Sequence, residues 1–202
     1  MADLRTECGV VVAKALNIFI KNKGFEVPEV EASSLSDSFW KVTLPQNLET
    51  SSVNSPAFNT FIAAQINLNC NSMLMNGTKV SDLVTISGDV HHIFPRAYLK
   101  NNGVTNKTKY NQVANYIYLD TQVNKAISDD APATYFAKVK EQCETKNIVF
   151  GNISNEELLK KNLEENCIPQ NIFDMTVGDY EGFLQERRKK MAGLIRNYYE
   201  CL

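Results

Sequence analysis

Apolar positions recur with the period of a helix along most of the chain. One such stretch runs over 3–23 and stops at Gly24, and a second runs over 57–75 and closes at Asn76-Gly77. Ser55-Pro56 precedes the second stretch, in the order of an N-cap followed by a proline at the first helical position. This helix is apolar on most sides, which favours a place in the centre of the core. Further helices are expected over 80–84, from 121 or 124, over 132–146, over 154–166 and over 177–199.

The middle of the chain instead has the pattern of two short strands. Asp89–Phe94 (DVHHIF) ends at Pro95, and 115–119 (NYIYL) is aromatic and β-branched. Between them, 96–111 predicts a polar loop that turns at Asn101-Asn102-Gly103. Upstream, 25–54 lacks helical period, and the apolar residues expected to form an extended anchor there are Phe39, Trp40 and Val42.

These elements predict a mainly α protein with a small two-stranded part, an α+β fold. We expect a single domain over 1–202, in which helical parts over 1–86 and 131–202 flank a strand–strand–helix unit over 87–130. Apolar residues make up 44% of the chain and charged residues 22%, which is enough for an ordinary hydrophobic core.

Cysteines and apolar runs indicate a cytoplasmic location. The longest apolar run, 9–20, is broken by Lys14 and Asn17, so no membrane span is expected, and no signal-peptide pattern opens the chain. The five cysteines are dispersed without a CxxC pair, which excludes a zinc ribbon and favours reduced thiols.

Charge is distributed unevenly along a chain of net charge −2. Between 96 and 125 five basic residues face a single acid, whereas 141–181 holds nine acids and three lysines. Local charge decides binding to phosphates, so a phosphate-bearing ligand is expected at the first segment, and the second is expected to face away from it. The run 187–190 (RRKK) is interpreted as a solvated helix face or as a second phosphate contact. The predicted phosphate contacts are Arg96, Lys100, Lys107, Lys109 and Lys125.

The only two histidines, His91 and His92, are adjacent. Neighbouring strand side chains diverge, so the pair is a poor chelate for one metal ion and suits one ligand and one base. A neutral imidazole can take a proton from water because its pKa lies near working pH. An Asn carbonyl at the start of the next helix supplies a hard oxygen, and two protein ligands are enough for Mg²⁺. Asp89 can orient a histidine by accepting its ring N–H.

With these residues, the order strand, loop, strand, helix resembles the HNH, or His-Me finger, endonucleases, which carry a ββα-metal finger. The resemblance implies that His91 binds metal and that the next residue, His92, is the catalytic histidine. It implies that Asn115 orders the loop between the strands and that Asn124, nine residues later, is the final ligand of Mg²⁺ or Mn²⁺. The spacing on to Pro132 is similar to that in the HNH domain of the CRISPR RNA-guided nucleases.

A wider resemblance covers nearly the whole chain. The segments HHIFPRAYLKNNG, KYNQVANYIYL, NLEENCIP and FLQERRKKMAGLIRNYY are similar to the C-terminal nuclease half of GmrSD-like restriction proteins. This resemblance implies a metal-dependent endonuclease that cuts double-stranded phage DNA, often modified DNA. Those proteins also contain a ParB-like nucleotide-hydrolysing domain, which this chain lacks together with any Gly-rich phosphate loop, so a partner domain or subunit is expected.

Two alternatives from other classes stay open. The first is a catalytically inactive nucleic-acid-binding or regulatory module of the same fold, although no residue of the motif is missing. The second is a zinc hydrolase, for which the sequence offers no third histidine or acidic ligand at a spacing such as HExxH.

Overall fold

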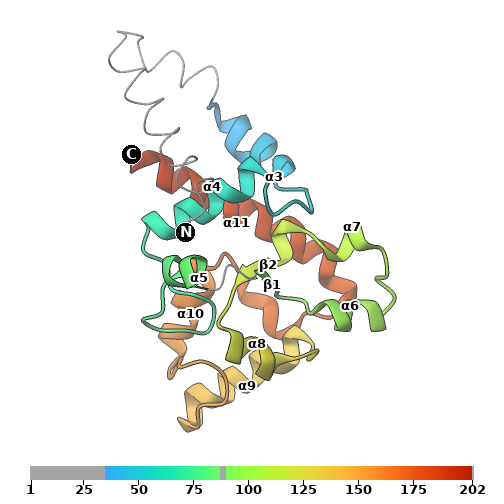
Figure 1. The fold of residues 1–202 in the computed structure, drawn as a ribbon, viewed down its shortest axis with the longest axis vertical. Coiled ribbons are helices and arrows are strands. Elements are labelled where there is room, and N and C mark those ends of the chain that lie inside the picture. Colours follow the sequence, from blue (N-terminus) through green and yellow to red (C-terminus); the bar gives the residue numbers. More distant parts are fainter. Residues whose placement is uncertain (1–34, 87–89, 202) are drawn as a thin grey trace.

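The computed structural model describes residues 35–86 and 90–201, which form a mainly helical protein with a small two-stranded antiparallel sheet (Figure 1). The helix expected over 3–23 and the first residue of the expected strand, Asp89, lie outside the described residues. No helix within the described ranges is long and apolar enough to cross a membrane. The elements are η1 Phe39–Thr43, α3 Leu44–Asn47, α4 Pro56–Asn67, α5 Val80–Ile86, β1 Val90–His92, α6 Arg96–Asn101, α7 Lys107–Tyr110, η2 Val113–Asn115, β2 Tyr116–Tyr118, α8 Thr121–Ile127, α9 Pro132–Thr145, α10 Glu156–Glu165, η3 Gln170–Asp174, η4 Val177–Asp179 and α11 Tyr180–Glu200.

The two predicted strands are confirmed and pair antiparallel. Val90 pairs with Tyr118, His91 with Ile117 and His92 with Tyr116. The strand–strand–helix order also holds, because α8 follows β2 after a two-residue connection. The Asp120 side chain caps this helix by accepting from the backbone N–H groups of Gln122 and Val123, at 2.8 and 3.2 Å.

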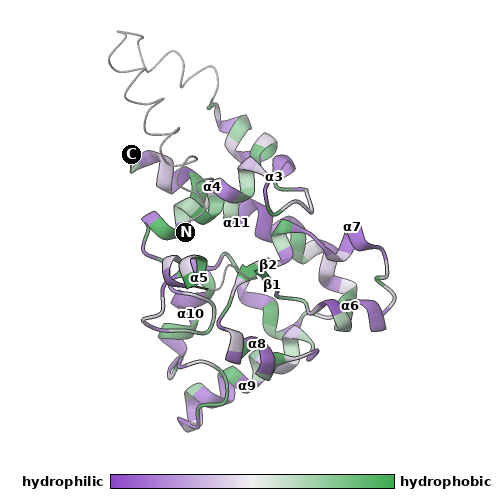
Figure 2. Ribbon diagram, in the orientation of Figure 1, coloured by the Kyte–Doolittle hydropathy of each residue, from purple (hydrophilic) through white to green (hydrophobic). Residues whose placement is uncertain are grey.

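Helix α11 forms the centre of the core. It packs against α3, α4 and η2, and Figure 1 shows it crossing the molecule from the C-terminus toward α6. Figure 2 shows hydrophilic and hydrophobic residues interspersed along its length, as the helical period requires. Its buried apolar residues lie at spacings of one, three and seven, which place them on one side of the helix, and are Tyr180, Phe183, Leu184, Met191, Ala192, Ile195 and Tyr198.

The expected central helix over 57–75 is shorter than predicted. Ser55 caps it as expected, accepting from the backbone N–H of Phe58 at 3.3 Å, but α4 ends at Asn67. The chain then turns back through Asn69 and Leu74, which both have positive φ, 56° and 60°, and no helix can continue through such residues. The apolar residues of 68–79 are therefore buried by a folded loop.

Two segments expected to be irregular are helical. The extended anchor is wrong, because Phe39–Thr43 and Leu44–Asn47 wind into η1 and α3 and bury Trp40 against Tyr199 of α11, with ring centroids 5.6 Å apart. The expected loop over 96–111 contains the short helices α6 and α7. Its turn is confirmed, because Gly103 has a φ of +91°, a conformation that favours glycine.

The remaining helices lie close to their predicted ranges. Over 80–84, 121 onward and 132–146 the structure has α5, α8 and α9. Helix α10 begins at Glu156 because Asn155, one residue after the expected start at 154, accepts from the backbone N–H of Leu158 at 2.9 Å.

Candidate functional site

His91 and His92 both lie on β1 and are half-buried. Consecutive side chains of a strand project to opposite faces, so the two imidazoles separate, as their predicted division of roles requires. His92 shares its face with its cross-strand partner Tyr116, whose ring stands edge-on to the imidazole at a centroid distance of 5.1 Å. This contact restricts the rotation of the His92 ring.

The His92 ring is hydrogen-bonded to Asn111, a residue that the sequence analysis did not identify. The Nε2 atom of His92 lies 3.0 Å from Oδ1 of Asn111. An amide oxygen only accepts, so Nε2 carries the proton and Nδ1 keeps its lone pair. Burial lowers the pKa of His92 below its ordinary value, and the nearby charge of Arg96 acts in the same direction, whereas the bond to Asn111 raises it. The balance favours a neutral imidazole.

Asn115 is buried and fastens the chain on both sides of the loop between the strands. Its Oδ1 accepts from the backbone N–H of Phe94 at 2.8 Å, and its Nδ2 donates to the Phe94 carbonyl at 3.1 Å and to the Tyr110 carbonyl at 3.4 Å. One side chain thus joins the segment just after His92 to the segment just before Asn111. The loop-ordering role that the resemblance implies for Asn115 stays a prediction, and these bonds are the contacts through which it would act.

The end of β1 is fixed by two further bonds. The backbone N–H of Ile93 donates to the Asn115 carbonyl at 2.9 Å, and the hydroxyl of Tyr135, on α9, donates to the Ile93 carbonyl at 2.9 Å. On the other side, the Tyr180 hydroxyl of α11 donates to the Tyr110 carbonyl at 3.3 Å. The backbone just after His92 is thus held by η2 and α9, and the backbone just before Asn111 is held by α11.

Asn124 lies on the first turns of α8 and is half-buried. Its backbone bonds belong to the helix, and among residues 35–86 and 90–201 its side-chain amide has no hydrogen-bond partner, so the oxygen is available to a ligand. Asp89, the predicted orienting carboxylate, lies outside the described residues.

The two predicted ligands, His91 and Asn124, offer an imidazole nitrogen and an amide oxygen. An ion such as Mg²⁺ needs few protein ligands, because it keeps several waters and binds substrate oxygens. In the part of the chain that the structure describes, no three His, Cys, Asp or Glu side chains gather in a metal-binding cluster.

The predicted phosphate contacts lie on three short helices and are exposed. Arg96 and Lys100 are on α6, and the Lys100 amine lies 5.2 Å from the centre of the Tyr110 ring. Helix α7, which carries two more of the basic residues, packs against α6 (Figure 1). The acidic helix α10 lies on the opposite side of the molecule in this view. The remaining exposed basic residues are Lys107, Lys109 and Lys125.

The interpretation of 187–190 is wrong for its first two residues. Arg187 is completely buried and Arg188 is only 5% exposed, so neither belongs to a solvated face or a DNA contact. Only Lys189 and Lys190 point to solvent. A run of charged residues in the sequence does not show which of them lie on the buried side of a helix that crosses the core.

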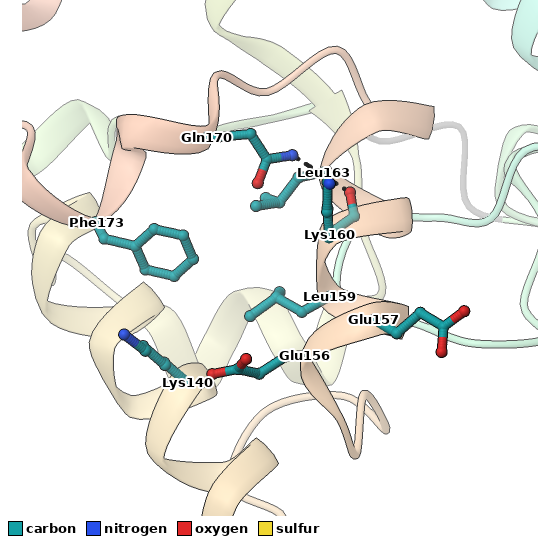
Figure 3. Close-up of a pocket in the computed structure, with 8 residues that line it drawn as sticks. All are labelled: Lys140, Glu156, Glu157, Leu159, Lys160, Leu163, Gln170 and Phe173. Atoms are coloured by element: carbon teal, nitrogen blue, oxygen red, sulfur yellow. Dashed lines mark hydrogen bonds between the residues drawn. The ribbon is translucent and has the colours of Figure 1, made fainter.

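A hollow of about 430 Å³ lies apart from these residues, between α9, α10 and η3 (Figure 3). Its lining mixes two lysines and two glutamates with an apolar floor, and Gln170 Nε2 donates to the Lys160 carbonyl at 3.4 Å across its rim. None of the predicted site residues lines it. The lining residues are Lys140, Glu156, Glu157, Leu159, Lys160, Leu163, Gln170 and Phe173.

The comparisons with known proteins assign neither a family nor a function to this chain. No protein-family model matches the chain, and neither a curated protein nor a solved structure matches it. The function therefore has to be argued from the chemistry of the residues around β1.

Proposed function

We propose that this chain is a metal-dependent DNA endonuclease of the HNH class, built on a ββα-metal finger. The observation that carries the proposal is the half-buried His92, whose Nε2 is bonded to Asn111 while Asn115 fastens the backbone on both sides of the loop. A neutral imidazole with one nitrogen occupied and the other unprotonated is what a general base needs.

In the proposed reaction, His92 Nδ1 removes the proton from the water that attacks the phosphodiester in line. Asn111 keeps the tautomer and, with the Tyr116 ring, the direction of the imidazole. Holding the base and water in one geometry lowers the entropic part of the barrier. Asn115 contributes by fixing the strand end that carries the base.

His91 and Asn124 are the proposed ligands of Mg²⁺ or Mn²⁺. The bound ion supplies neutralisation of the charge on the scissile phosphate and on the leaving oxygen. The divergence of adjacent strand side chains keeps His91 from competing with His92 for the same position. Asp89 is proposed to orient one of the two rings.

The proposed substrate is double-stranded DNA, most naturally phage DNA met in the cytoplasm by a restriction protein. The exposed basic residues of α6, α7 and α8 support this substrate because phosphates bind to exposed cations near the site. Such contacts position the duplex without reading its sequence. A ParB-like nucleotide-hydrolysing domain or subunit is the proposed partner, by the resemblance alone.

The alternative from another class is an inactive nucleic-acid-binding or regulatory module. The His92–Asn111 bond favours the enzyme, since a binding module has no need of a histidine held in one tautomer. The two proposals differ in one measurement, the cleavage of DNA.

Incubation of supercoiled plasmid with the protein and Mg²⁺, with and without EDTA, tests the proposal. We expect nicked or linear plasmid only without EDTA, and His92→Ala, still folded and still binding DNA, should cut about 10²–10⁴ times more slowly. Lys140→Ala, at the hollow, is the matched control and should cut like the parent. DNA binding without cleavage by the parent would support the inactive module, and cleavage in excess EDTA would contradict the metal.

A further inference from the structure

Arg187, in the middle of α11, is among the largest fully buried side chains. Burial lowers the pKa of its guanidinium to about 10, so the group stays charged at neutral pH. Removing such a charge from water is unfavourable unless it is well paired, and an apolar side chain of similar volume is often equally good for stability. A buried arginine at this position therefore indicates a role other than general stabilisation of the core.

The partners of Arg187 are three backbone carbonyls. Its Nη1 donates to the carbonyls of Ala114 and Tyr116, at 2.9 and 2.7 Å, and its Nε and Nη2 both donate to the Asn166 carbonyl, at 3.3 Å. Across the described ranges Arg187 forms no ion pair with a carboxylate. Its charged guanidinium is hydrogen-bonded to backbone carbonyls instead.

Two of these carbonyls flank Asn115 directly. The guanidinium therefore holds the peptide unit that precedes Asn115 and the peptide unit that follows Tyr116, on either side of the residue that joins Phe94 to Tyr110. Phe94 stands two residues after His92, and Tyr110 stands one residue before Asn111, the acceptor for the His92 ring. A shift of the backbone at Asn115 would reach both partners of the imidazole hydrogen bond.

We propose that Arg187 is a positioning residue for the candidate site, acting through Asn115 on the placement of His92 and Asn111. The inference rests on the proposed function, because it assigns Arg187 a part in the same reaction. The planar guanidinium can span the two carbonyls on either side of Asn115 and reach a third, whereas the point charge of a lysine cannot hold all three in one geometry.

Arg188 offers a matched control on the same helix. It is nearly as buried, donates from Nη2 to Gln112 Oε1 at 3.0 Å and pairs with Glu49 at 3.6 Å, but does not bond to either carbonyl beside Asn115. Substitution of Arg188 removes a buried arginine and leaves the bonds of Arg187 to the Ala114 and Tyr116 carbonyls in place.

The experiment compares Arg187→Lys and Arg187→Gln with Arg188→Gln, below the unfolding temperature of each. For the two Arg187 variants we expect kcat on plasmid DNA to fall about tenfold to a hundredfold, with the DNA Kd within twofold of the parent. The lysine variant should retain more activity than the glutamine variant, and Arg188→Gln should stay within threefold of the parent.

Amide hydrogen exchange supplies a readout that does not need activity. The backbone N–H of Phe94 bonds to Asn115 Oδ1 and should exchange faster in Arg187→Lys, whereas that of Leu159, bonded to Asn155 in α10, should not change. If the parent does not cut DNA, the proposed function fails, and this exchange still decides whether Arg187 holds Asn115.

Three results would overturn the inference. They are an unchanged kcat in the folded Arg187 variants, equal losses in the Arg187 and Arg188 variants, and faster exchange spread evenly over Phe94 and Leu159. Failure of both Arg187 variants to fold would also overturn it, since Arg187 would then support the whole core.

Discussion

Single side chains around β1 act on one another through a short series of hydrogen bonds. Arg187 holds the carbonyls beside Asn115, Asn115 holds Phe94 and Tyr110, and Asn111 holds His92. Buried hydrogen bonds that are satisfied in this way hold the groups that they join in a fixed geometry. The geometry of the proposed base therefore depends on residues far from it in sequence.

The role of Asn111 can be tested by removing its amide. Asn111→Ala should slow plasmid cleavage about tenfold, because the His92 ring loses the acceptor that selects its tautomer, while DNA affinity should not change. Asn102→Ala is the control, because Asn102 is an exposed asparagine of the same loop region whose side chain donates to the Tyr98 carbonyl. Equal rates for parent and Asn111→Ala would show that the bond has no part in the reaction.

The proposed ligand role of Asn124 predicts a change in metal dependence. Asn124→Ala should raise the metal concentration for half-maximal cleavage and weaken Mn²⁺ binding in calorimetry, since one oxygen ligand is lost. Mn²⁺ should also support cleavage by the parent, because imidazole suits it. DNA binding in the absence of metal should stay the same, and an unaltered metal titration would exclude Asn124 as a ligand.

At the scale of elements, the loop 68–79 depends on α10 for its shape. Asn162, which is buried, accepts from the backbone N–H of Leu74 at 2.8 Å and donates to the carbonyls of Ser72 and Met75, at 2.9 and 3.0 Å. The Ser72 hydroxyl in turn donates to the Tyr118 carbonyl of β2, at 3.3 Å. Hydrogen bonds through this loop thus connect α10 to the sheet.

Loss of this side chain should destabilise the fold. Asn162→Ala removes three hydrogen bonds and leaves the buried backbone N–H of Leu74 without its partner, so the free energy of unfolding should fall by about 2–5 kcal/mol. Chemical denaturation followed by circular dichroism measures the change. The exposed Asn147→Ala serves as the control and should stay within about 0.5 kcal/mol of the parent. A stability loss below that limit for Asn162→Ala would contradict the structural role.

At the scale of the whole molecule, charge separates two flanks. The basic residues of α6 and α7 lie on one flank of Figure 1, and the acidic helix α10 lies on the other. A duplex carries a dense row of phosphates, so we expect the proposed DNA substrate to lie on the first flank and not on the second. This arrangement agrees with a DNA path across the strand–strand–helix unit.

The proposed DNA path predicts the salt dependence of binding. Replacement of Lys107 and Lys109 together with alanine should weaken binding equally for all sequences and flatten the slope of log K against log salt by about 0.9 for each lost contact. Replacement of Lys160 and Lys161, two exposed lysines of α10, is the matched control and should leave the slope unchanged. If the α10 replacement flattens the slope and the α7 replacement does not, DNA binds at the α10 flank instead.

Features encoded within a few neighbouring residues were predicted correctly. The cap at Ser55, the turn at Gly103 and the strands around the histidines depend on local chemistry, and the structure confirms them. The association of His91, His92, Asn115 and Asn124 with one strand–strand–helix unit also followed from their order in the chain. Their chemical roles stay predictions.

Other features of the fold depend on contacts between segments that are far apart in the sequence. Local sequence patterns do not encode such contacts. The positive φ of Leu74 is held by Asn162, 88 residues later, and Trp40 becomes part of a helix that packs on Tyr199. Asn111 and Arg187 could not be found from the sequence for the same reason: their partners are single atoms on remote backbone and ring groups. The sequence by itself determined the kinds of element and the candidate chemical groups. Only the tertiary structure decided which buried polar groups satisfy one another, because burial leaves them no solvent to bond with.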